Sequence, residues 1–241
     1  MIEDRYYYSI LDKADKEIYK KILEGIIRRD KEIILHVGNK AQEEIINLVQ
    51  YVNLDNPLIY YVDFQLVLWN IYPNCIGYTP KYLYSDDEIE VLKEKTENAI
   101  AKILKRVTKT DDTEKEKQIH DILIENIRYD FNARSHLRKN SPTANTILGV
   151  LFYKAAVCEG IAKLTKVLLN RLDIKCIVAA GNEKNDKVKH AWNVVKINDN
   201  AYHLDVTYDL GCSIGPLISY RYFNVTAEKM RRERDFFVKY P

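Results

Sequence analysis

Two stretches in the second half of the chain, HAWNVVKI (190–197) and NAYHLDV (200–206), alternate between apolar and polar residues and are separated only by Asn198-Asp199. Such alternation predicts strands, and a two-residue connection of Asn and Asp predicts a type I′ turn, because both residues tolerate the left-handed conformation. We therefore expect an antiparallel hairpin in which Ile197 pairs with Asn200. The turn constrains the fold strongly, since it fixes the register and thereby which side chains share a face.

One face of this hairpin carries side chains that can do chemistry. His190 lies opposite Thr207 and Trp192 opposite Asp205, so His190 and Asp205 are diagonal neighbours about 7–8 Å apart at the backbone, a gap that their side chains can bridge. His203 shares this face. The opposite face is apolar or aromatic and carries Ala191, Val195, Ile197, Leu204, Val206, Tyr202 and Tyr208. A turn one residue later would move the histidine and the carboxylate farther apart, and a three-residue loop would place them on opposite faces.

The stretch AAVCEGIAKL places Cys158 where an apolar run meets the start of a helix, whose apolar face is Ile161, Leu164, Leu168 and Leu172. The free N–H groups and the positive dipole end of a helix start favour a thiolate. A cysteine nucleophile also needs a histidine within reach and a third group that orients this histidine. Since His190 and Asp205 follow downstream, we predict a catalytic set of Cys158, His190 and Asp205. The alternative is a cysteine buried in the core as a small apolar residue.

The other cysteines are better explained by packing. Cys75, Cys176 and Cys212 are all expected in the core, and Cys212, in a glycine-rich loop, has no catalytic partner in the sequence. A zinc site of Cys158, Cys176, His190 and Cys212 is arithmetically possible, but no two of these ligands have the close spacing that is typical of zinc sites. We predict neither a metal nor an organic cofactor, and no disulfide framework.

Three further histidines and Trp192 lie outside the predicted catalytic set. His120 is expected to pack or to lie on a helix surface, and His136, in a basic loop, to lie on the surface. His203 is expected behind the catalytic residues or facing solvent. Trp192 either contacts substrate or fills the core beside the site.

The rest of the chain is predicted to combine helices with short strands. Residues 54–85 are rich in Tyr, Ile, Val and Leu and interrupted by prolines, which is typical of short strands joined by turns. The polar segment 108–117 is either a boundary or a solvated helix end that runs into the next helix. We place an N-terminal α+β region at residues 1–110 and a catalytic domain at residues 111–241. Helices are expected at about 14–28, 40–52, 86–107 and 113–126.

The near balance of charges gives no electrostatic reason to expect binding to nucleic acid. Lys and Arg number 37 against 35 Asp and Glu, which leaves a net charge of only +2. The sequence has no apolar run long enough for a membrane span. Its charged, tyrosine-rich start does not resemble a secretory signal, so a cytoplasmic location is expected, or a secreted one if a leader has been removed. The oligomeric state is not predicted.

Three motifs also carry a resemblance. AAVCEGIAKLTKVLL, KHAWNVVKI and YHLDVTYD occur in this order between about Glu114 and Asp209, together with the helix IHDILIENIRYD and the lead-in NTILGVLFYKAAVCEG. They resemble the transglutaminase-like domain of the papain-like cysteine-enzyme superfamily, and the stretch LDNPLIYYVD resembles, more loosely, the leader region of bacterial members. The chain departs from the family at Ile161, where a tyrosine is usual, and at Tyr208, where a tryptophan is usual. Tyr208 falls on the apolar face, so its change would only repack the core, whereas Ile161 could alter a wall of the site.

The resemblance implies an α+β fold with a papain/transglutaminase-like core. Its nucleophile helix would pack on an antiparallel sheet, preceded by a helical and short-stranded N-terminal region. It implies Cys158 as nucleophile, His190 as base and then acid, and Asp205 as the orienting carboxylate. The backbone N–H of Cys158 is one natural oxyanion donor, and a second donor is expected upstream at a position that the sequence does not identify.

The expected reaction is acyl transfer or hydrolysis on amide bonds of a protein or peptide substrate, through a thioester. Water as acceptor makes a protease or amidase, and an amine makes a transglutaminase. The catalytic residues are common to both, so they leave the choice open. The second hypothesis is a non-catalytic interaction module that retains the fold.

Overall fold

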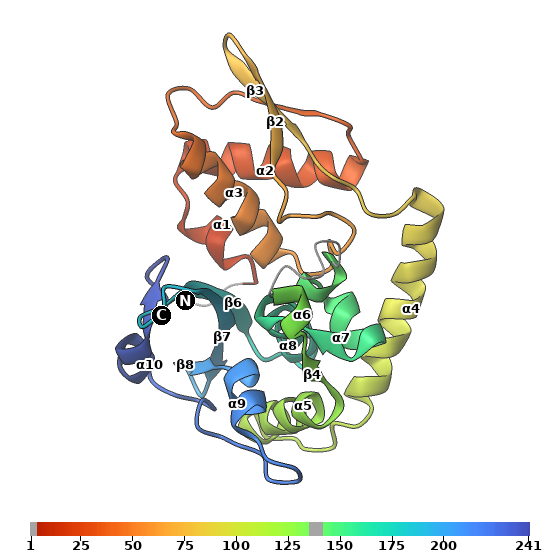
Figure 1. Cartoon of the computed structure of the whole chain (residues 1–241), viewed down its shortest axis with the longest axis vertical. Helices are drawn as coiled ribbons and strands as arrows, with labels where there is room; N and C mark the ends of the chain where they lie inside the picture. Colours follow the sequence, from red (N-terminus) through yellow and green to blue (C-terminus); the bar gives the residue numbers. More distant parts are fainter. Residues whose placement is uncertain (1–3, 135–141) are drawn as a thin grey trace. The chain divides into compact units, whose positions relative to one another are not determined.

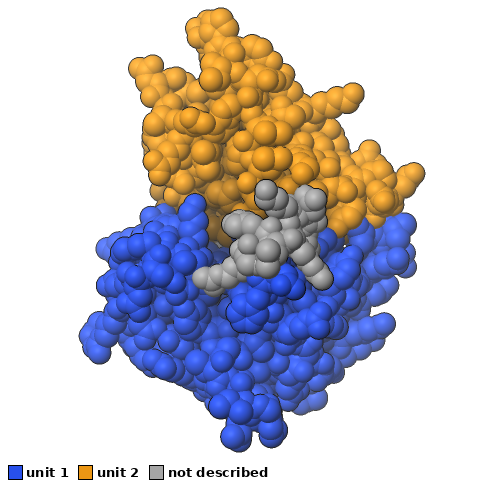
Figure 2. Space-filling view, viewed as in Figure 1, with its two compact units in different colours: residues 1–4, 91–241 blue, residues 5–90 orange. Residues whose placement is uncertain are grey.

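The structure is a computed structural model that describes residues 4–134 and 142–241. The loop residue His136 lies outside the described residues. The chain divides into a compact unit of residues 5–90 and a larger one of residues 91–241 with the start of the chain (Figure 2). In the chain, the division falls between residues 90 and 91, whereas the predicted boundary lies between residues 110 and 111. That boundary stays a prediction, because compactness does not test which segment folds on its own.

The smaller unit packs helices against a short antiparallel sheet in the order β1-β3-β2. Its helices have apolar stripes at helical spacing, and in α2 the residues Ile18, Ile22 and Ile26 of this stripe are all buried. Strands β2 and β3 lie in the tyrosine-rich segment where short strands were predicted. The elements are α1 (Tyr6–Ile10), α2 (Lys13–Arg28), β1 (Ile33–Leu35), α3 (Gln42–Asp55), β2 (Leu68–Tyr72) and β3 (Cys75–Thr79).

The long helix α4 (Asp86–Leu104) begins where a helix was expected, directly after Ser85. The Ser85 hydroxyl accepts the backbone N–H of Glu88 at 3.3 Å, and the Glu88 carboxylate accepts the backbone N–H of Ser85 at 2.8 Å. This reciprocal pair is a capping box. Helix α5 (Asp112–Asn126) follows after a short connection, with Asp111 as its cap. Most of the polar segment 108–117 is therefore the start of a helix.

The larger unit is built on the antiparallel sheet β8-β7-β6-β9 (Figure 1). Its strands are β6 (Cys176–Glu183), β7 (Lys189–Ile197), β8 (Asn200–Leu204) and β9 (Arg234–Phe236). Two short strands that precede this sheet in the sequence, β4 (Arg128–Tyr129) and β5 (Ala155–Ala156), form a separate parallel pair. The other elements are α6 (Phe131–Arg134), the 3-10 helix Pro142–Asn145, α7 (Ile147–Tyr153), α8 (Cys158–Arg171), α9 (Val206–Cys212) and α10 (Ala227–Glu233).

The β7–β8 hairpin has the predicted turn and register. Asn198 and Asp199 have positive φ values of 47° and 63°, and Ile197 pairs with Asn200. The second strand is shorter than predicted, because β8 ends at Leu204 and the next residue caps a helix. The expected pairs of His190 with Thr207 and of Trp192 with Asp205 are therefore wrong.

Helix α8 packs on strands β6 and β7, as the α+β prediction requires (Figure 1). Asn193 of β7 is buried and donates from Nδ2 to the carbonyl oxygens of Ala162 in α8, at 2.9 Å, and Ile177 in β6, at 3.2 Å. One side chain thus joins the helix to both strands. On the other side of α8, a Cβ at Gly160 would lie 2.5 Å from the carbonyl oxygen of Ala144, so only glycine permits this close approach.

None of the helices in the described part of the chain combines the length and apolarity that crossing a membrane requires.

Candidate active site

Cys158 is the first residue of helix α8. The chain enters the helix from β5, and the N-cap residue Val157 has no side chain that could accept the free N–H groups of the first turn. These N–H groups and the helix dipole make the position electropositive. Cys158 is partly exposed, in contrast to Cys176, which is buried. All four cysteines are free in the structure.

His190 of β7 and Asp205 form a buried pair. His190 Nε2 lies 2.6 Å from Asp205 Oδ2, and the two residues are 3% and 0% exposed. Asp205 follows the end of β8, where its other oxygen Oδ1 accepts the backbone N–H of Tyr208 at 3.0 Å and caps α9. The carboxylate is therefore held by a helix start as well as by the imidazole. The predicted partnership is present, although the strand geometry used to predict it is not.

The remaining nitrogen of His190, Nδ1, is buried and has no hydrogen-bond partner within the described residues. Burial lowers the pKa of His190, but the charge and hydrogen bond of Asp205, with a smaller effect of the nearby Cys158 sulfur, raise it to about 10. For Asp205, burial raises the pKa, and the charges of His190 and Arg234 outweigh it, so this pKa is lowered. The pair is thus an imidazolium and a carboxylate at neutral pH.

Residues 101–206 match the family model of the transglutaminase-like superfamily. This part of the chain is a transglutaminase-like domain. It contains Cys158, His190 and Asp205, the residues predicted to be catalytic. No curated protein matches the chain.

Two solved structures are similar to the chain at low identity. A TGase shares 15% sequence identity at a TM-score of 0.42, over 73% of this chain and 50% of that protein. A candidate cysteine protease from Cytophaga hutchinsonii shares 16% identity at a TM-score of 0.37, over 59% of this chain and 61% of that protein. The chain thus spans about half the length of the first and less than two thirds of the second.

Trp192 and His203 lie behind the histidine of the transglutaminase-like domain. Trp192 is only 1% exposed and stacks on His190 with the ring centroids 6.0 Å apart. Its indole N–H donates to His203 Nδ1 at 2.8 Å. Burial, with a smaller effect of the Arg231 charge, lowers the pKa of His203 to about 4, so this ring is neutral and can accept. The contacts favour the core interpretation of Trp192, and a contact with substrate stays a prediction.

Tyr208 lies against the site and not on the core face of the hairpin, so this prediction is wrong. Because Asp205 starts α9, the residues that follow coil back beside the histidine. The Tyr208 ring meets the His190 ring edge-on with the centroids 5.0 Å apart. The change from the tryptophan that is usual in the family therefore alters a wall beside His190. Ile161, the other departure, is 1% exposed inside α8.

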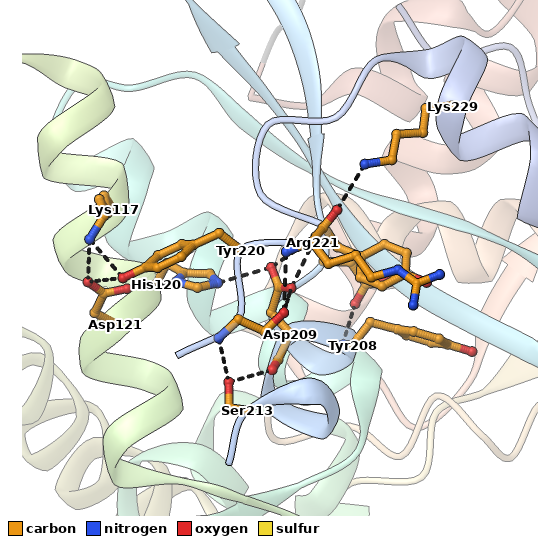
Figure 3. Close-up of polar contacts among 12 residues, drawn as sticks. Lys117, His120, Asp121, Tyr208, Asp209, Ser213, Tyr220, Arg221 and Lys229 are labelled. Carbon is orange, nitrogen blue, oxygen red and sulfur yellow. Dashed lines mark hydrogen bonds and ion pairs between the residues drawn. The ribbon is translucent and has the colours of Figure 1, made fainter. Parts of the chain in front are cut away.

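A second buried His–Asp pair anchors helix α9 (Figure 3). His120 of α5 is fully buried, with Nε2 3.2 Å from Asp209 Oδ2 and Nδ1 2.9 Å from Asp121 Oδ1. Asp209 also accepts the Ser219 hydroxyl at 2.9 Å and the backbone N–H of Tyr222 at 3.0 Å. His120 therefore packs in the interior, which was one of its two interpretations. It connects α5 to α9, the helix that Asp205 caps.

Arg234 is the residue of this neighbourhood that the sequence did not indicate. It begins β9, is 3% exposed, and brings Nη2 to 3.5 Å from Asp205 Oδ2. Its strand pairs with β6 at Glu183, about fifty residues earlier in the chain, so no local motif announces the contact. Asn193, which joins α8 to the sheet, could have been found as the fourth residue of HAWN.

Within residues 4–134 and 142–241, no three His, Cys, Asp or Glu side chains come together in a group that could hold a metal ion. Cys158, Cys176, His190 and Cys212, the zinc ligands considered from the sequence, therefore do not come together as such a group. Cys212 is exposed at the end of α9, so the expectation that it lies in the core is wrong, and Cys75 is only partly buried.

Proposed function

We propose that this protein is a cysteine-dependent acyl-transfer enzyme that acts on amide bonds of a protein or peptide substrate. Cys158 is the nucleophile, His190 its acid and base, and Asp205 the group that orients the imidazole. The observation that carries the proposal is the buried 2.6 Å contact of His190 with Asp205, which leaves the opposite ring nitrogen of His190 for the Cys158 sulfur. The transglutaminase-like match over residues 101–206 supports it.

The first half of the reaction forms a thioester. The Cys158 thiolate attacks the amide carbonyl carbon, an S–C bond forms, and the carbonyl electrons move to the oxygen. The backbone N–H of Cys158, at the uncapped helix start, is the donor that we expect to bind this oxyanion. As the tetrahedral intermediate collapses, the C–N bond breaks, and the Nδ1 proton of His190 passes to the departing amine.

The second half transfers the acyl group. Neutral His190 now takes a proton from the acceptor, which is water or an amine, and the acceptor attacks the thioester carbon. The S–C bond breaks and the thiolate returns beside the imidazolium. Asp205 stays ionised throughout and stabilises the charge on His190. Water gives a peptidase or amidase reaction and a lysine amine gives a transglutaminase reaction.

The test uses a small activated ester as acyl donor, so that it does not depend on how the protein recognises its natural substrate. The protein is mixed with p-nitrophenyl acetate, quenched in acid, and digested, and the acetyl thioester is located by mass spectrometry. We expect a burst of p-nitrophenolate with acetylation at Cys158, lost in Cys158→Ala and reduced by about a hundredfold or more in His190→Ala, in line with the usual contribution of general acid–base catalysis. Cys212 is the internal control, because it is exposed and lies at the end of a helix, not at its start.

Acetylation of Cys212 at the same rate as Cys158, or a rate at Cys158 that does not depend on His190, would refute the proposal. Either outcome would favour the non-catalytic interaction module.

A further inference from the structure

Arg234 is a buried cation next to the proposed site. Only 3% of it is exposed, and it lies at the junction of α10 and β9, where the chain joins the edge of the sheet. Taking a charged side chain out of water is unfavourable unless partners compensate the lost hydration. The partners of Arg234 therefore indicate why the charge is there.

The two closest partners lie in one segment of the chain. Asp205 Oδ2, the same oxygen that contacts His190, lies 3.5 Å from Nη2 of Arg234. The guanidinium also lies over the ring of Tyr208, 4.2 Å from its centroid, in a cation–π contact. Both partners belong to the start of α9. Arg234 thus packs against the segment that holds Asp205 and against the tyrosine that borders His190.

The hydrogen bonding of Arg234 is incomplete. Its Nε and Nη2, which form one edge of the guanidinium, are buried without a hydrogen-bond partner in the described part of the chain. Only Nη1 has one, a long contact of 3.4 Å with the carbonyl oxygen of Glu233. A purely structural arginine usually satisfies this edge with a carboxylate. Here the Asp205 carboxylate is close enough to this edge for an electrostatic attraction, but it does not form a hydrogen bond with it.

Other charged or titratable groups also face this cation. Glu233, its chain neighbour, brings Oε2 to 3.8 Å from Nη1, and Tyr222 lies 6.0 Å away, ring centroid to guanidinium. Glu183 of β6 pairs with Arg234 across the sheet. Tyr208 completes the set. Of these groups, only Asp205 is a fully buried acid in contact with His190.

We propose that Arg234 is a positioning residue of this site, which keeps Asp205 ionised and aligned and sets the pH range in which Cys158 and His190 exist as a thiolate–imidazolium pair. This rests on the proposed function. The Arg234 charge lowers the pKa of Asp205, after the effect of His190. The same charge opposes the imidazolium and favours the thiolate, so both pH limits of the pair lie lower with Arg234 than without it.

The test is the pH profile of iodoacetamide labelling at Cys158, followed by peptide mass spectrometry. The profile of an ion-paired thiol has a lower step, where the pair forms, and an upper step, where the imidazolium loses its proton. We expect Arg234→Met to move both steps upward by on the order of one pH unit, and Arg234→Lys, which keeps the charge, to stay close to the wild type. Arg232→Met is the matched control, because this side chain is 73% exposed and pairs with Glu228 on the surface.

The outcomes separate the two proposals. A wild-type profile without the two steps, or one that is the same in His190→Ala, refutes the proposed function itself. A two-step wild-type profile that keeps its positions in Arg234→Met, with only the rate reduced, refutes the role of Arg234 alone. Equal shifts in Arg234→Lys and Arg234→Met also refute it, because the charge would not be the cause. If Arg234→Met does not fold by circular dichroism, Arg234→Gln takes its place.

Discussion

Replacing Asp205 by asparagine removes the charge that holds the proton on His190. Asp205 is the main group that raises the pKa of His190 against its burial, from an ordinary 6.5 to about 10. Without this carboxylate, only the smaller effect of the Cys158 sulfur opposes burial, so we expect the pKa of His190 to fall to about 6.5 or below. At pH 7 an imidazole with a pKa of about 6.5 is only about a quarter protonated. The thiolate–imidazolium population at pH 7 should therefore fall at least about fourfold.

The assay is the rate of iodoacetamide labelling at Cys158, from about pH 5 to about pH 10. We expect the upper step of the profile to move from near pH 10 in the wild type to below neutrality in Asp205→Asn. Asp199→Asn is the matched control, since its carboxylate pairs with Lys196 on an exposed turn and its side chain is 93% exposed. An upper step that stays in place in Asp205→Asn would refute the reasoning, because some other group would then hold the imidazolium.

The same substitution has a signature in stability. A histidine with a raised pKa stabilises the folded state fully below its unfolded value, and this contribution is lost as the pH rises through the folded value. The wild type should thus exceed Asp205→Asn by about 3–5 kcal/mol in the free energy of unfolding near pH 6, the usual cost of breaking a buried ion pair. Urea titrations should show this difference shrinking towards pH 10. A difference that grows with pH would contradict the assignment.

Three further substitutions test how the site is held, each measured by urea or thermal unfolding. Asn193→Ala leaves the carbonyl oxygens of Ala162 and Ile177 without their donor, and we expect a loss of about 2–3 kcal/mol; a loss under about 0.5 kcal/mol would contradict this. Gly160→Ala forces a methyl group against backbone oxygens and should cost about 1–3 kcal/mol or more, which an unchanged melting temperature would disprove. His120→Phe removes the imidazole that contacts the carboxylates of Asp121 and Asp209. We expect this variant to lose about 3 kcal/mol of stability and to label more slowly at Cys158. Normal labelling in the folded variant would show that the position of α9 does not depend on His120.

The sequence was informative wherever the geometry is local. The Asn198-Asp199 connection determined the hairpin register, because two residues of positive φ leave little freedom to a turn. The helical stripes followed from contacts between residues three or four positions apart. The start of α8 at Cys158 followed from an apolar lead-in that gives way to helical spacing.

The predictions that failed concern contacts between elements. Asp205 was expected to continue a strand, but its side chain accepts the Tyr208 backbone N–H and starts a helix, a choice that alternation alone does not reveal. That one change brought Tyr208 to the histidine. Arg234 and the His120–Asp209 pair reach the site across long sequence separations, which depend on how strands and helices pack and not on any local pattern. The second oxyanion donor stays unassigned.

The most direct test of the central claim compares the four cysteines in a single labelling experiment. At about pH 6.5, well below the pKa of about 8.5 for a free thiol, iodoacetamide is applied to the wild type and to His190→Ala, and each cysteine is followed by its peptide. We expect Cys158 to label faster than the exposed Cys212 in the wild type and to lose this advantage in His190→Ala. Cys176, whose pKa is raised by burial, should stay unlabelled in both. A Cys158 that is no faster than Cys212, or equally fast without His190, would contradict the central claim.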